Sequence, residues 1–348
     1  MDLKAFDDYV GQRRIVSQLL PDLTACLKQH KTPPHMVLYG RPGLGKDHLV
    51  VRIGQFLGAR VHMFYGPEIA RDKRWSWNNA FKEFVSDDPK DEWPGLDMAG
   101  FIKEPERVEK QILVINEAEA VSTAQWESLH PVLMPGPDGR RLYMECVNQK
   151  MGSYVHCWAA PFTLILLTNF ITKLRQNAMA VVDRCSKVMQ IQPYSDEELA
   201  SIIVTFSKKN HVDIDPAAAI DLSKRAKASP RRAEQLWQSC DNERVLKDAA
   251  HITARHVQAA MDREGVADDG LNDEDLNYLA ALSNSPGGVG QERLACVLGM
   301  PVDVLSSEIE PWLFQQNLIT VVAGTGRVLT HDGLRRVGRS GRSNLRFA

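Results

Sequence analysis

The sequence lacks the features that mark membrane, disulfide-rich and metal-scaffold proteins. No apolar run reaches the roughly 18 residues that a membrane helix needs, and the opening MDLKAFDDYVGQ is polar and acidic, unlike a secretory signal. The six cysteines stand singly, with no C-x-x-C pair and no histidine at metal-ligand spacing. We therefore expect reduced thiols, a cytoplasmic location and no membrane partner.

A basic excess is missing as well. Lys and Arg total 42 against 44 Asp and Glu, which gives a net charge of −2 and excludes a uniformly basic nucleic-acid-binding coat. The charge is uneven, however. From Gly324 to Ala348 six arginines stand against one acidic residue, so this stretch carries +5 and the remainder −7. Basic charge is concentrated at the C-terminal end.

What is present is an ordinary globular composition over 348 residues, with 44% hydrophobic and 25% charged residues, enough for two or three domains. Short apolar runs lie at Met36 to Tyr39, Ile112 to Ile115 and Phe162 to Leu167, separated by helical stretches. Continuous apolar strands of this kind are typical of a parallel sheet covered on both faces. The first part of the chain is predicted to be α/β.

The pattern changes to helices after Pro193, and beyond residue 271 it gives three helices followed by strands at Leu318 to Val322 and Arg327 to Thr330. That last layout is typical of a winged helix. We predict four parts: an α/β domain (1–192), a helical domain (193–265), a winged helix (266–338) and a basic flexible tail (339–348).

Two segments inside the first domain stand apart. Residues 141–158 have the pattern of a β-hairpin. Residues 67–110 carry several tryptophans and many charges, and are expected to form helical pieces with an irregular connection. No chemistry can be assigned to this second segment.

The clearest motif is a phosphate-binding loop. Residues 40–46, GRPGLGK, fit G-x-x-x-x-G-K between a strand and a helix, where backbone N–H groups bind phosphates and Lys46 reaches the outer ones. The alternative, a glycine-rich turn with a chance lysine, does not explain the flanking strand and helix. The predicted nucleotide-binding residues here are Gly40, Gly43, Leu44, Gly45, Lys46, Asp47 and His48.

The expected magnesium site departs from the usual pattern at two positions. A Ser or Thr residue normally follows the lysine, but this sequence has Asp47 at that position. Asn116-Glu117 stands where an Asp-Glu pair is usual. The changes are complementary, so we hypothesise that Asp47 supplies the anionic Mg²⁺ contact, directly or through water, while Asn116 orients it. Alternatively, Asp47 crowds the ion or pairs with Lys46 and closes the site. Glu117, the candidate general base, is present.

Three further residues are candidates for contact with the terminal phosphate. Asn169 ends the third apolar strand, where it can meet the γ-phosphate or the attacking water, although strand-end turn residues are common. Arg184 precedes another strand and can act across a subunit boundary as an arginine finger, the alternative being a surface charge. Arg231 lies in the first turn of a helix of the second domain, where it can face a nucleotide phosphate. The alternative is an ordinary arginine that faces solvent.

Collinear segments over nearly the whole chain resemble the RuvB branch-migration family, which are hexameric AAA+ ATPases. These segments include FDDYVGQ (6–12), LYGRPGLGK (38–46), ILVINEAE (112–119), APFTLILLTN (160–169), VVDRC (181–185), ASPRRA (228–233), IEPWLFQQNLI (309–319) and GTGRVLT (324–330). The departures at Asp47 and Asn116, and the long stretch between Lys46 and Asn116, indicate a divergent relative.

The resemblance implies an AAA+ domain, a helical lid and a winged helix, with ATP and Mg²⁺ as cofactors. It also implies a role for each candidate residue. Tyr9 and Val10 line the adenine pocket with Tyr194 nearby, Glu117 is the Walker B base, Asn169 is sensor 1, Arg184 is the trans-acting finger and Arg231 is sensor 2.

The resemblance further implies a ring-forming motor, a homohexamer, that acts on branched or duplex DNA in recombination, repair or replication. Arg327, after the wing turn, is expected to contact the DNA backbone, with Arg335 and Arg336 as weaker candidates; a surface arginine is the alternative for each. The hairpin 141–158 matches the element that docks on a RuvA-like partner, although its tip, NQKMG, differs. The alternative function is a catalytically impaired DNA-binding ring or adaptor in which nucleotide is structural.

Overall fold

The computed structural model describes residues 5–77, 80, 110–134, 141–148, 153–159 and 162–340. The chain forms two compact units: residues 1–40 with 45–192, and residues 41–44 with 193–348. Each unit is described by itself. No helix in the described ranges is both long enough and apolar enough to span a membrane.

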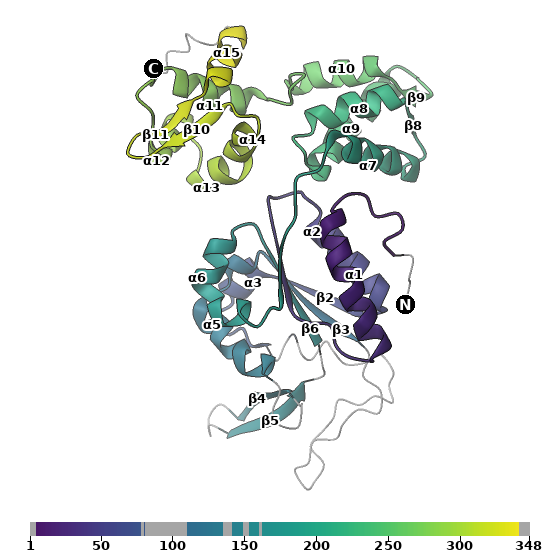
Figure 1. Ribbon diagram of the computed structural model, residues 1–348, viewed down its shortest axis with the longest axis vertical. Helices are drawn as coiled ribbons and strands as arrows, with labels where there is room; N and C mark the ends of the chain where they lie inside the picture. The colour runs from purple at the N-terminus through teal and green to yellow at the C-terminus, as the bar shows by residue number, and fades with distance from the viewer. Residues whose placement is uncertain are drawn as a thin grey trace. The chain divides into compact units, whose positions relative to one another are not determined.

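The first unit is built on a five-stranded sheet in the order β2-β3-β6-β1-β7, in which every neighbouring pair is parallel (Figure 1). The strands are β1 (Met36–Tyr39), β2 (Arg60–Tyr65), β3 (Gln111–Asn116), β6 (Phe162–Thr168) and β7 (Lys187–Gln190). All residues of β6 are buried, as its unbroken apolar run predicts. The predicted α/β parallel sheet is confirmed.

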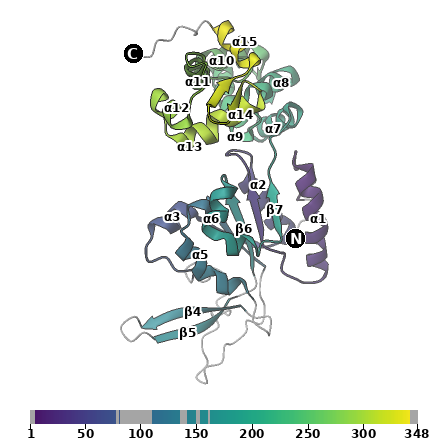
Figure 2. The ribbon, with the colours of Figure 1, turned by 60° about the vertical axis from the view of Figure 1, so that its left-hand side comes forward.

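Helices cover both faces of this sheet. They are α1 (Arg13–Lys28), α2 (Lys46–Leu57), α3 (Gly66–Arg71), α5 (Thr123–Leu129) and α6 (Ile171–Val182), with short turns η1 (Ala118–Ala120) and η2 (His130–Leu133). Figure 2 shows α3, α5 and α6 on one side of the sheet and α1 on the other. On the first side, Leu113 and Leu166 pack in one cluster with Trp126 of α5.

Two tryptophans of the segment 67–110 belong to this core. Trp77 is 3% exposed, stacks on Trp126 with 5.5 Å between ring centroids, and donates its indole N–H to the carbonyl of Gln125. Trp75 packs edge-on against Trp77 and Phe64. These two residues therefore stabilise the α/β core. The stretch from 81 to 109 lies outside the described residues.

The predicted hairpin is present as β4 (Arg141–Asn148) and β5 (Ser153–Ala159), which pair antiparallel with an irregularity between Cys146 and Asn148. Its tip, residues 149–152, lies outside the described part of the chain. No disulfide joins the cysteines whose side chains are described.

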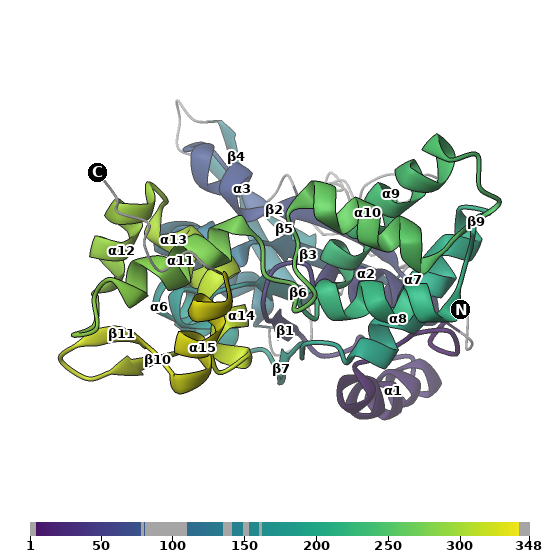
Figure 3. The same ribbon diagram turned by 90° about the horizontal axis from the view of Figure 1, so that it is seen from above.

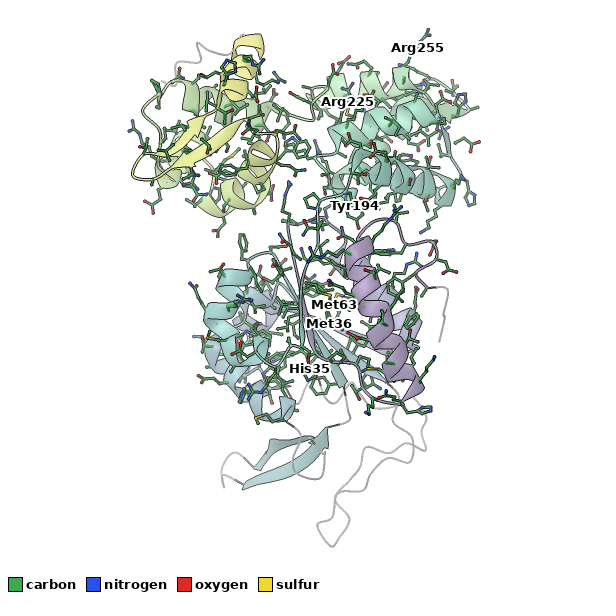
Figure 4. The ribbon with its side chains drawn as sticks, in the orientation of Figure 1. His35, Met36, Met63, Tyr194, Arg225 and Arg255 are labelled. Carbon is green, nitrogen blue, oxygen red and sulfur yellow. The ribbon has the colours of Figure 1, made fainter. Side chains whose placement is uncertain are left out.

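The second unit contains a helical group and a winged helix. The helical group comprises α7 (Asp196–Lys209), α8 (Pro216–Arg225), α9 (Pro230–Leu246) and α10 (Ala254–Glu264), with a two-stranded ribbon of β8 (Asp213–Ile214) and β9 (His251–Ile252). A capping box between Ser195 and Glu198 begins α7, as the sequence predicts. Figure 4 shows Arg255 projecting outward from α10.

The winged helix comprises α11 (Asp273–Ser283), α12 (Gln291–Leu298), α13 (Val302–Val304), η3 (Leu305–Ile309), α14 (Glu310–Gln315), β10 (Ile319–Val322) and β11 (Gly326–Leu329). The two strands pair antiparallel, and a further helix, α15 (His331–Ser340), lies beside them (Figure 3).

Helix α15 was not predicted, and it extends two residues into the stretch expected to be a flexible tail. Val337 is 4% exposed and packs in the winged-helix core, and Gly333 lies against the carbonyl of Leu318, where a Cβ would approach to 2.1 Å. The basic composition of this segment concealed its single buried face. Residues 341–348 lie outside the described part of the chain.

A buried ion pair joins the helical group to the winged helix. Asp275 is fully buried, and its carboxylate accepts hydrogen bonds from Lys227 Nζ and from the Asn272 N–H. Lys227 and Ala228 both have positive φ, 51° and 55°, a conformation that is costly for residues other than glycine. The ion pair therefore holds a strained turn directly before α9.

Removing Lys227 leaves the Asp275 carboxylate buried without its cation, which typically costs about 3–5 kcal/mol. We expect Lys227→Met to lower the free energy of unfolding of this unit by that amount, measured by urea denaturation with far-UV circular dichroism. Lys224→Met, at an exposed position of α8, is the matched control. A loss below about 1 kcal/mol, as is usual for a surface charge, would contradict this interpretation.

Candidate functional site

The polar residues that follow β1, β3 and β6 lie at one edge of the sheet. Because these strands are parallel, their carboxyl ends meet, and the register pairs Tyr39 with Thr168 and Ile115 with Leu166. The phosphate-binding loop follows β1, Asn116 ends β3, and Asn169 follows β6. Three segments far apart in the sequence thus converge as predicted.

The loop and its helix have the geometry of an anion-binding turn. Helix α2 begins at Lys46 after Gly45, whose φ is 80°, and Gly43 has a φ of 78°. Lys46 is 8% exposed, and its Nζ donates to the Gly40 carbonyl at 2.8 Å and to Asn169 Oδ1 at 2.7 Å. The structure therefore brings together two residues predicted independently to meet the phosphates.

Among the described residues, no hydrogen bond joins the two unusual residues of the expected metal site, Asp47 and Asn116. Asn116 Oδ1 accepts the N–H of Glu117 at 2.9 Å, and Asp47 is exposed in the first turn of α2. The described residues contain no cluster of three His, Cys, Asp or Glu side chains. The donors on offer, one carboxylate and one amide, suit a hard cation held mainly by a nucleotide's own phosphates.

Glu117 sits in a constrained backbone position. Its φ is 53°, its side chain is exposed, and its carbonyl lies against Gly66 at the start of α3. A Cβ on Gly66 would lie 2.1 Å from that carbonyl oxygen. Gly66 therefore permits the close approach of the Glu117 backbone.

Aromatic rings gather beside the first turn of α2. Tyr9 stacks on His48, with 5.7 Å between ring centroids and an interplanar angle of 14°, and Phe6 packs edge-on against Tyr9. Val10 is half-buried in the same segment. Stacked aromatic rings of this kind suit the flat face of a nucleobase.

The tip of the loop, residues 41–44, groups with the second unit. There the Arg231 N–H and the Ser229 hydroxyl both donate to the Gly43 carbonyl at 3.3 Å. Leu44 is 2% exposed. Tyr194, buried at the start of the helical group, donates its N–H to the carbonyl of Ala228. The turn before α9 therefore contacts both Gly43 and Tyr194.

Arg184 lies just beyond the end of α6, half-buried. Its Nη1 donates to the carbonyl of Ala180 at 2.6 Å, and its Nη2 lies 3.1 Å from Met134 Sδ. Met134 and Met179 beside it are 54% and 65% exposed. The guanidinium is thus held within its own domain by weak acceptors rather than by a carboxylate.

The wing arginines have carboxylate partners. Arg327 forms two hydrogen bonds with Glu310, at 3.0 and 3.1 Å, and these raise its pKa. Tyr278 donates its hydroxyl to the same carboxylate, and its pKa is raised by burial. Arg335 pairs with Asp332, and Arg336 with Asp269. Arg327 therefore stabilises the winged helix, and DNA contact by these arginines stays a prediction.

Sequence reasoning missed two residues that support the site. The Gln12 side chain donates to the Gln192 carbonyl at 2.7 Å and accepts its N–H at 3.0 Å, which ties the Tyr9 segment to the end of the first unit. Glu119 is 6% exposed and accepts the N–H of Asn169 at 3.1 Å. Both belong to segments quoted in the family resemblance, but their contacts depend on the tertiary fold.

We expect Gly66→Ala to lower the free energy of unfolding by about 1–3 kcal/mol, the usual cost of overpacking, because its Cβ must displace the backbone of Glu117. The measurement is thermal unfolding followed by calorimetry. Gly287→Ala is the matched control, since no atom lies within 4 Å of its added Cβ. Equal effects of the two substitutions would show that the contact at Glu117 is not tight.

Two family models match parts of this chain. The family model of the Holliday junction DNA helicase RuvB P-loop domain matches residues 1–76, and that of the RuvB C-terminal winged helix domain matches residues 268–337. The first match ends inside the tryptophan-containing segment 67–110.

Similarity to individual proteins extends over almost the whole chain. The Holliday junction branch migration complex subunit RuvB of Nitratiruptor sp. is 27% identical over 326 residues, covering 93% of this chain and 88% of that protein. The protein of the same name from Kosmotoga olearia is 26% identical over 343 residues, 95% of this chain and 88% of the relative.

The fold matches a solved structure as well. The Thermotoga maritima RuvB Holliday junction branch migration motor has a TM-score of 0.76 and 24% identity, with 96% of this chain and 97% of that chain covered. One family model matches each end of the chain, and the RuvB relatives align over nearly all of it, so this chain is similar to RuvB proteins over almost its whole length.

Proposed function

We propose that this chain is an ATP-driven DNA motor of the RuvB branch-migration type, acting as a cytoplasmic ring on branched or duplex DNA. The observation that carries the proposal is the convergence of Lys46, Asn169 and Glu117 at one edge of the parallel sheet, with Lys46 Nζ 2.7 Å from Asn169 Oδ1. A phosphate-binding lysine beside a strand-end amide and a carboxylate is typical of sites that hydrolyse nucleotides.

Each residue has a defined task in this proposal. The N–H groups of the loop and the Lys46 ammonium hold the phosphates, and the Asn169 amide contacts the terminal one. Glu117 accepts a proton from the attacking water, and the stacked rings of Tyr9 and His48 lie beside the base. Asp47, together with the nucleotide's phosphates, would hold Mg²⁺, and the ion would supply positive charge that offsets the negative charge of the phosphates.

The alternative, a ring in which nucleotide is only structural, draws support from the same two departures. Asn116 Oδ1 is engaged by the Glu117 N–H, and no hydrogen bond joins Asp47 to Asn116 in the described structure. Retention of Glu117, Arg184 and Arg231 favours the motor, since a site without turnover has no use for these three residues.

DNA contact is assigned to the winged helix. Arg335, with 63% of its side chain exposed, is better presented to a phosphate than Arg327, with 19%. The hairpin β4–β5 is the surface proposed for a RuvA-like partner. The curated relatives are named as subunits of a Holliday junction branch migration complex, which supports junction DNA as a ligand and a protein as a partner.

Exchanging the two unusual residues tests the metal site. We expect Asp47→Thr alone to lower ATP turnover at least about tenfold, because it removes the carboxylate next to the ion, and Asp47→Thr with Asn116→Asp to restore it. Steady-state phosphate release measures both. Background turnover by the unmodified protein, with activity gained only in the double variant, would support the impaired alternative.

The ring proposal requires Arg184 to complete a neighbour's site. Lys46→Ala and Arg184→Ala subunits should each be inactive alone, yet an equal mixture should recover up to about one quarter of normal turnover, because random neighbours rebuild that share of the sites. Arg175→Ala, at an exposed position of α6, serves as the control and should remain active. No recovery on mixing would contradict a trans-acting Arg184.

A further inference from the structure

The first unit buries two fully charged side chains among its described residues. They are Lys46, 8% exposed, and Glu119, 6% exposed. A charge removed from water is costly unless an opposite charge or several hydrogen bonds compensate it. Each of these two buried ions therefore needs hydrogen-bond partners within the protein.

Asn169 connects them. Its side-chain Oδ1 accepts from Lys46 Nζ at 2.7 Å, and its backbone N–H donates to Glu119 Oε1 at 3.1 Å. Asn169 thus lies between a cation and an anion, with its side-chain oxygen toward the lysine and its backbone N–H toward the glutamate. Both hydrogen bonds are charge-assisted, the stronger and more directional class.

Glu119 is itself fixed in place. Its own carbonyl accepts the side-chain amide of Asn177 in α6 at 3.1 Å, which anchors the turn η1. Its second carboxylate oxygen, Oε2, is buried and has no hydrogen-bond partner in the structure. The carboxylate is thus held through Oε1, which accepts the Asn169 N–H.

We propose that Glu119 is a positioning residue for the terminal phosphate. It holds the Asn169 backbone at the end of β6 so that the side-chain amide meets the γ-phosphate. The inference rests on the proposed function in one respect, the contact between Asn169 and the γ-phosphate. Glu119 touches no nucleotide atom and acts only through Asn169.

This role has a signature in binding rather than in turnover alone. ADP lacks the third phosphate group of the slowly hydrolysed analogue ATPγS. The difference between the affinities for the two nucleotides therefore reports the contacts made to that group. Loss of Glu119 should therefore reduce the preference for ATPγS over ADP while leaving the affinity for ADP nearly unchanged. A residue that only stabilises the fold would weaken both affinities together.

The test compares the two dissociation constants, by calorimetric titration with Mg²⁺ present, for Glu119→Gln, Glu119→Ala, Asn169→Ala and the double variant of Glu119→Gln with Asn169→Ala. Gln keeps an acceptor oxygen and loses the charge, so we expect about a threefold fall in preference for Gln and about a tenfold fall for Ala. Glu127→Gln, at an exposed position of α5, should match the unmodified protein.

The double variant separates action through Asn169 from action elsewhere. If Glu119 works through that residue, Glu119→Gln should add no further loss once Asn169 is Ala. This comparison holds even where Glu119→Ala fails to fold. A further loss of the preference for ATPγS over ADP in the double variant would overturn the proposal. So would an unchanged preference in both Glu119 variants, or an unchanged preference in Asn169→Ala.

The outcome is independent of hydrolysis. A protein that binds both nucleotides without ATP turnover would refute the proposed motor function. The preference for ATPγS over ADP would still decide the role of Glu119. Conversely, normal turnover together with unchanged preference in the Glu119 variants would refute this inference and leave the motor standing.

Discussion

The hydrogen bond between Lys46 and Asn169 depends on the parallel order of the strands, and the rest of the site depends on that bond. Parallel pairing places the carboxyl ends of β1, β3 and β6 at one edge, so the loop lysine, Glu117 and Asn169 meet although more than a hundred residues separate the first from the last. An antiparallel strand among the three would send one of these residues to the opposite edge.

Much of this was predictable because its signals are local. Unbroken apolar runs predicted buried parallel strands, and G-x-x-x-x-G-K between a strand and a helix predicted the loop. Residues whose task depends on distant partners were not predictable. The role of Trp77 depends on its stacking on Trp126, which lies far from it in the sequence. The basic composition of α15 does not indicate that one side of this helix is buried.

Charge pairing shows the same limit. Arg327 follows the wing turn and is predicted to contact DNA, yet it is bound to Glu310, seventeen residues earlier in the chain. Glu119 lies two residues after the candidate base, and only the fold shows that it holds Asn169. A sequence reveals that a charge is present, but the tertiary contacts decide whether that charge faces a ligand or a partner within the protein.

We infer that the departures at Asp47 and Asn116 leave a working motor, since Lys46, Asn169 and Glu117 lie at the same edge of the sheet. The most direct measurement is steady-state ATP turnover by the purified protein with and without a four-way DNA junction. We expect turnover above background that rises several-fold when the junction is added. Background turnover under both conditions, by protein that still binds nucleotide, would contradict it.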